Sequence, residues 1–191
     1  MSFVLPPVPF YFLRHGVTDH NLRRLVMGQL DVPLNDQGRR QAELAARQVV
    51  GLGISRIVSS PLSRARETAE VIAGRLGLPV RIVPDLRERA WGEMTGRTHR
   101  ELMRARATPK GAESLGVFAQ RIEQTIQTLT QPEMVLIVAH SGICRVLRRT
   151  LDIDDGEGPV PNAVPLLFAP RPGGGWSEHA ITAPCAAVGR R

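Results

Sequence analysis

The chain has 191 residues, of which 42% are hydrophobic and 23% are charged, and this ordinary globular composition excludes intrinsic disorder as its main description. No apolar stretch reaches the roughly 18 residues that cross a bilayer, and the first ten residues contain three prolines and no basic residue. We therefore expect neither a membrane span nor a signal peptide. We expect the protein to be cytoplasmic. The length predicts one domain over residues 1–191, large enough to bury a core without disulfides or a structural metal.

The net charge is +7, and Lys110 is the only lysine among 25 basic residues. Arginine keeps its charge and binds planar anions through two parallel hydrogen bonds, which suits phosphate or carboxylate partners. The charge also permits nucleic-acid binding, but only 4% of the residues are aromatic and no nucleic-acid motif is present. We expect no nucleic-acid partner. Cys144 and Cys185 form no C-x-x-C pair, which indicates reduced thiols, and Cys144 is expected in the core.

Four short apolar segments predict strands at residues 10–13, 56–58, 80–83 and 134–139. Segments that are apolar on both faces are typical of central strands in a mainly parallel sheet.

Amphipathic helices are predicted between and after these strands. One begins at Asn35 and Asp36, a second spans residues 62–76 and ends at Gly77, a third is capped by Ser114, and a fourth covers residues 143–150. This order predicts an α/β fold whose mainly parallel central sheet carries helices on both faces.

Two further segments complete the predicted fold. Residues 85–113 are too many for a plain connection and show weak periodicity apart from a short helix near 98–106, so we expect a short lid insertion. Residues 164–169 and 176–181 flank three consecutive glycines and predict a C-terminal edge hairpin.

Polar residues follow each of the four predicted strands. They are Arg14 and His15, then Arg64, then Glu88, and finally His140. Because ligands of open parallel sheets bind beyond the carboxyl ends of the strands, we expect these side chains to meet at one edge.

This set of side chains fits phosphoryl transfer from a monoester. The imidazole of His15 can attack phosphorus, and neighbouring arginines keep it neutral. Arg14, Arg64 and His140 can bind the charged equatorial oxygens of the transition state. Glu88 can protonate the departing alkoxide and then activate water, although Asp85 and Glu93 are nearby alternatives for this acid.

The segments LRHGVTDHN, SSPLSRARETA, LRERAWGEMTG and VAHSGICRVLR resemble the motifs of the histidine phosphatase superfamily, phosphoglycerate mutase-like branch (branch 1). The resemblance implies that His15 is the phosphorylated nucleophile and Glu88 the proton donor. It also implies no metal and no organic cofactor. The residues expected to bind the phosphoryl group are Arg14, His15, Asn21, Arg64, His140 and Ser141.

Several alternatives remain open at this stage. A phosphoglycerate mutase-type phosphotransferase would pass the phosphoryl group to a second hydroxyl, but only about 25 residues separate Glu88 from Ser114, and a short lid should admit water. A basic phosphate- or nucleic-acid-binding module without turnover is a further alternative. Hydrolysis of small phosphate monoesters is the favoured function. The sequence does not identify the physiological substrate, and it leaves the oligomeric state open, a homodimer included.

Other residues have competing interpretations. Asn21 can cap a turn instead of binding phosphate. Arg97, Arg100 and Arg104 share one face of the predicted lid helix and form either a solvated surface or a site for a second anionic group. The three remaining histidines, His20, His99 and His179, are expected at the surface.

Overall fold

The computed structural model describes residues 5, 7–130, 133–153 and 158–182. Its centre is a six-stranded sheet of order β3-β2-β4-β1-β5-β6. The four strands β1 to β4 run parallel to one another, and β5 and β6 form an antiparallel hairpin joined to β1. The strand bounds are β1 Phe10–Arg14, β2 Arg56–Ser59, β3 Val80–Ile82, β4 Val135–Ala139, β5 Pro165–Pro170 and β6 Trp176–Ala180. The predicted α/β fold and its edge hairpin are confirmed.

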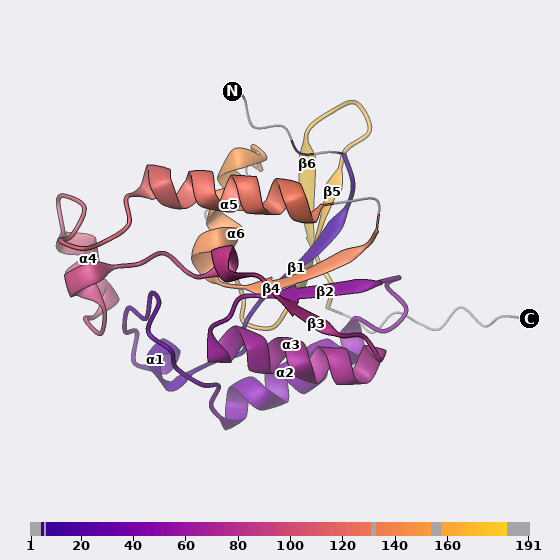
Figure 1. Ribbon diagram of the computed structural model, residues 1–191, viewed down its shortest axis with the longest axis horizontal. Helices are drawn as coiled ribbons and strands as arrows, with labels where there is room; N and C mark the ends of the chain where they lie inside the picture. The colour runs from indigo at the N-terminus through magenta and orange to yellow at the C-terminus, as the bar shows by residue number, and fades with distance from the viewer. Residues whose placement is uncertain (1–4, 6, 131–132, 154–157, 183–191) are drawn as a thin grey trace, which may run out of the picture.

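Helices cover both faces of the sheet. In Figure 1, α2 (Asp36–Gln48) and α3 (Ser63–Leu76) lie below the strands, and α5 (Leu115–Leu129) and α6 (Ser141–Thr150) lie above them. Each layer buries its own apolar cluster, because strand side chains alternate between the two faces. Among the described residues, no helix has the length and apolar character of a membrane span.

The predicted helix boundaries follow from specific caps. Asn35 Oδ1 accepts a hydrogen bond from the backbone N–H of Gly38 at 2.9 Å, and Ser114 Oγ accepts one from Val117 at 3.2 Å. Gly77 ends α3 in the left-handed region, at φ 68°. Local side-chain chemistry therefore sets where these helices begin and end.

The expectation that residues 80–83 form a central strand is wrong. Among the described strands, β3 lies at the sheet edge, pairs with β2 alone, and exposes Arg81 and Ile82. An edge strand has solvent along one side, so it tolerates the arginine that interrupts this apolar segment.

The lid segment, residues 85–113, is held against the loop that follows α1 (Asp19–Leu22). It contains α4 (His99–Arg104), which is shorter than the predicted helix over 98–106. The segment begins within the 3₁₀ turn Pro84–Leu86 and ends just before α5. Backbone hydrogen bonds join Val26 N–H to the Arg97 carbonyl at 2.8 Å and His99 N–H to the Arg24 carbonyl at 2.9 Å. The left side of Figure 1 shows α1 and α4 next to each other.

Candidate active site

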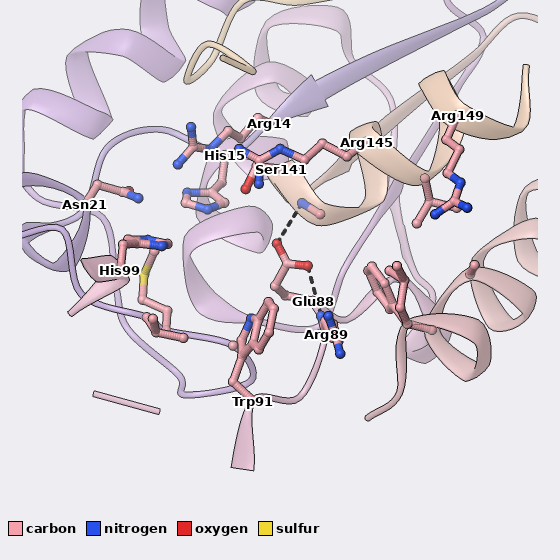
Figure 2. A pocket seen from close by; sticks show the side chains of 18 of the residues that line it. Arg14, His15, Asn21, Glu88, Arg89, Trp91, His99, Ser141, Arg145 and Arg149 are labelled. Atoms are coloured by element: carbon pink, nitrogen blue, oxygen red, sulfur yellow. Dashed lines mark hydrogen bonds between the residues drawn. The ribbon is translucent and has the colours of Figure 1, made fainter. Parts of the chain in front are cut away.

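A cavity of about 760 Å³ opens at the carboxyl ends of the parallel strands, between the lid segment and α6. Figure 2 shows the side chains that face it. The residues predicted from the strand ends that line it are Arg14, His15, Asn21, Arg64, Glu88 and Ser141.

His15 is only 2% exposed, and its orientation is fixed by its neighbours. Its Nδ1 lies 2.7 Å from the carbonyl oxygen of Gly16. Since a carbonyl only accepts, Nδ1 carries the proton and Nε2 keeps a free lone pair. Burial, together with the charges of Arg64 and Arg14, holds the pKa of His15 well below its usual range. The ring is therefore neutral near pH 7.

Backbone carbonyls hold the guanidinium groups of Arg14 and Arg64 at this site. Arg64 is 1% exposed and donates from Nη1 to the Leu30 carbonyl and from Nη2 to the Gly28 carbonyl, at 2.9 and 2.8 Å. Arg14 donates from Nη1 to the Val160 carbonyl at 2.7 Å. In both residues the buried Nε–H has no hydrogen-bond partner among the described residues. Burial lowers the pKa of Arg64 to about 10, which still leaves it charged at neutral pH.

His140 is completely buried and lies behind the cavity surface, with its ring centroid 5.3 Å from that of His15. Its Nε2 lies 2.8 Å from Ser60 Oγ, which itself accepts the Leu62 N–H. The Ser60 hydroxyl can then donate its proton to His140 Nε2, which must be unprotonated to accept it. This hydrogen bond favours the His140 tautomer that carries its proton on Nδ1. That Nδ1 has no hydrogen-bond partner within the part of the chain that the structure describes. Burial, with the charge of Arg64, also lowers the pKa of His140 well below its usual range.

The carboxylate of Glu88 is clamped by two backbone N–H groups. Gly142 donates to Oε2 at 3.0 Å and Arg89 donates to Oε1 at 2.9 Å, as the dashed lines of Figure 2 show. A Cβ at position 142 would collide with Glu88 Oε1, so this close approach depends on glycine. Asp85 and Glu93, the other two carboxylates that the sequence offered for the acid, do not line the cavity.

Asn21 caps a helix and also lines the cavity. Its Oδ1 accepts the backbone N–H and the hydroxyl of Thr18, at 3.0 and 3.1 Å, and so completes the cap of α1. Its side-chain amide points toward His15 in Figure 2, leaving the NH₂ group as a donor at the cavity. Ser141 lines the cavity as the first residue of α6, a helix whose N-terminal end is favourable for anions.

Other cavity residues were not predicted from the sequence. Arg145 and Arg149 come from α6, and His99 and Trp91 come from the lid segment. His99 is exposed, as expected, but its ring faces the cavity in Figure 2. The lid arginines that sequence reasoning singled out lie elsewhere: Arg97 and Arg104 line a separate surface hollow, and Arg100 lines neither.

Cys144 points into the core and is fully buried, as predicted, and burial raises the pKa of its thiol to about 12. Cys185 lies outside the described residues. Within the described part of the chain, no group of three or more His, Cys, Asp or Glu side chains is arranged to hold a metal ion.

Residues 10–159 match the family model of the histidine phosphatase superfamily (branch 1). The chain is 30% identical over 153 residues to the adenosylcobalamin/alpha-ribazole phosphatase of Escherichia coli, covering 72% of this chain and 75% of that protein. It is 37% identical over 154 residues to phosphoglycerate mutase-like protein 4 of Arabidopsis thaliana, covering 71% and 67%. The native structure of a mycobacterial glucosyl-3-phosphoglycerate phosphatase superposes with a TM-score of 0.76 at 29% identity, covering 91% of this chain and 97% of that one.

Two histidines, two buried arginines and a hydrogen-bonded carboxylate lie together at the ends of the parallel strands, and the family match covers the segments that supply them. The chain belongs to the histidine phosphatase superfamily, branch 1, and is a phosphoric monoester hydrolase of that family.

Proposed function

We propose that this phosphatase hydrolyses small phosphate monoesters in two steps, through a phosphohistidine on Nε2 of His15. The single observation that carries the proposal is the hydrogen bond from His15 Nδ1 to the Gly16 carbonyl. It leaves Nε2 unprotonated and fixed in direction, which is what a nucleophile requires.

In the first step, Nε2 attacks phosphorus and the bond from phosphorus to the ester oxygen breaks. The proton of Glu88 goes to the departing oxygen, which leaves as an alcohol. The free Nε–H groups of Arg14 and Arg64 and the Nδ1–H of His140 bind the three equatorial oxygens.

In the second step, the Glu88 carboxylate takes a proton from water while the water oxygen attacks phosphorus. The phosphorus–nitrogen bond breaks, inorganic phosphate leaves, and His15 and protonated Glu88 are regenerated. The NH₂ group of Asn21 and the hydroxyl of Ser141 are additional phosphate contacts in this scheme.

The substrate class is a small organic phosphate monoester. By their names, two similar proteins act on alpha-ribazole phosphate and on glucosyl-3-phosphoglycerate. A cavity of about 760 Å³ is within the range of pockets that enclose small molecules of this kind.

The test is phosphate release from p-nitrophenyl phosphate in EDTA, combined with trapping of a labelled phosphoenzyme in an alkaline, denaturing quench. We expect turnover and a base-stable, acid-labile phosphoenzyme in the wild type, and neither in His15→Ala. His179→Ala removes an exposed histidine on β6 and serves as the matched control. Turnover by His15→Ala at the wild-type rate would refute the proposal.

A further inference from the structure

The cavity holds more positive charge than the transferred phosphate needs. Five arginines line it against two glutamates, Glu88 and Glu123. In the mechanism above, Arg14 and Arg64 neutralise the phosphoryl dianion. Arg89 donates to the Glu113 carbonyl at 2.8 Å and lies over the Trp91 ring at 4.2 Å, so it is part of the wall. The two arginines left over are Arg145 and Arg149.

Arg145 and Arg149 are four residues apart on α6 and therefore share one face of that helix. Figure 2 shows Arg145 nearer to Ser141 and Arg149 farther along the helix. Both are exposed and line the cavity, and neither forms an ion pair with another described residue. Glu123, on the facing helix α5, instead accepts the hydroxyl of Thr150 at 2.8 Å.

The charge of Arg145 acts inside the cavity. Besides burial, the charges of Arg145 and Arg14 lower the pKa of His99, which faces the same space from the lid segment. Arg145 likewise contributes, after burial, to the lowered pKa of Arg14. The charge contributions to these lowered pKa values show that the electrostatic potential at this opening is positive. Such a potential favours the binding of anions.

We infer that Arg145 and Arg149 form a second anion site, which selects monoesters whose alcohol carries an additional carboxylate or phosphate group. This inference rests on the proposed function, because the first phosphate must be bound beside His15. The α6 helix rises about 1.5 Å per residue, so the arginines begin roughly 7 Å beyond His140 along its axis. The preferred substrate thus separates its two anionic groups by a spacer of several atoms.

Apolar side chains also line the cavity that holds the two charged regions. Trp91 comes from the lid segment, Phe118 and Ala119 from α5, and Val146 from α6. A hydrocarbon or ring spacer can be buried against these groups, at a gain of about 25 cal/mol for each Å² removed from water.

The experiment compares two substrates that differ only in the remote charge. They are the phosphate monoester of ω-hydroxyhexanoic acid and the same compound as its primary amide, for which the leaving alcohol is nearly identical. We expect wild-type kcat/KM to favour the acid about tenfold, and this acid-to-amide ratio to fall to about one in the Arg145→Gln/Arg149→Gln double variant. The ratio is measured within each variant, so a general loss of activity cancels.

The matched control is the Arg97→Gln/Arg104→Gln double variant, which removes the same charge from the lid segment outside the cavity. It should keep the wild-type ratio. Three results would overturn the second anion site: a wild-type acid-to-amide ratio near one, an unchanged ratio in the α6 variant, or an equal fall of the ratio in the lid variant. In each case, turnover of both compounds would still support the proposed hydrolase. No phosphate release from either compound would contradict the proposed function itself.

Discussion

The substitution Gly142→Ala tests the proposed role of Glu88 without replacing Glu88 itself. Gly142 lies in α6, where alanine is otherwise favourable by roughly 0.5–1 kcal/mol. Its added Cβ would collide with Glu88 Oε1, which is the far end of a flexible side chain. We expect the fold to persist and the carboxylate to move by about 1 Å or more.

A displacement of this size should cost about 100-fold in proton transfer to the leaving group, which is about 2.7 kcal/mol at 1.36 kcal/mol per tenfold. The assay compares kcat/KM for an alkyl phosphate, whose alkoxide needs the proton, with that for p-nitrophenyl phosphate, whose phenolate hardly does. The alkyl phosphate should lose about 100-fold and the nitrophenyl ester less than about tenfold.

Gly74→Ala is the matched control, since Gly74 is also inside a helix and a Cβ there meets nothing within 4 Å. It should leave both activities unchanged. Equal losses for the two esters in Gly142→Ala, or none at all, would refute Glu88 as the proton donor to the leaving group.

Three further predictions concern charge and burial. Arg64→Ala removes a buried donor and should lower kcat/KM for p-nitrophenyl phosphate by about 100-fold or more, measured by initial rates. Arg148→Ala leaves Glu178 without its 2.6 Å partner and should lower the urea-unfolding free energy by about 3 kcal/mol, whereas Arg39→Ala, in an exposed pair with Asp36, should change it by less than about 0.5 kcal/mol. Burial lowers the pKa of His15 in the folded state, so as the pH falls the unfolded state takes up a proton on this residue before the folded state does. The contribution of His15 to the free energy of unfolding is therefore full above about pH 6.5 and falls as the pH drops below it. In urea titrations between pH 7 and 5.5, His15→Ala should reduce the slope of unfolding free energy against pH by up to about 1.4 kcal/mol per pH unit.

The positions of His15, Arg64 and Glu88 could be predicted from the sequence because each follows a recognisable strand. Parallel strands end at one edge of a sheet, and so chain order alone brings their following residues together. The caps at Asn35 and Ser114 were equally local and are confirmed.

The edge position of β3 and the far wall of the cavity could not be predicted in this way. Whether a short apolar strand has one neighbour or two depends on pairing across the whole sheet. Arg145 and Arg149 do fall outside the apolar stripe of their own helix, which is a local signal. Their presence in the cavity nevertheless depends on how α5 and the lid segment pack opposite them, and the lid is positioned by backbone hydrogen bonds to the loop around Val26.

Glycines link the fold to the geometry of this site more directly than any apolar contact. A Cβ on Gly16 would strike the Gly38 carbonyl, so the loop that carries His15 can pack on the first turn of α2 only because both positions lack side chains. Gly28, at φ 51°, turns its carbonyl to accept from Arg64. Gly142 leaves room for the Glu88 carboxylate. Each contact helps to place one side chain of the proposed site through the backbone, which moves less than a side chain, and this is how a site with few hydrogen bonds between two side chains can be ordered before substrate binds.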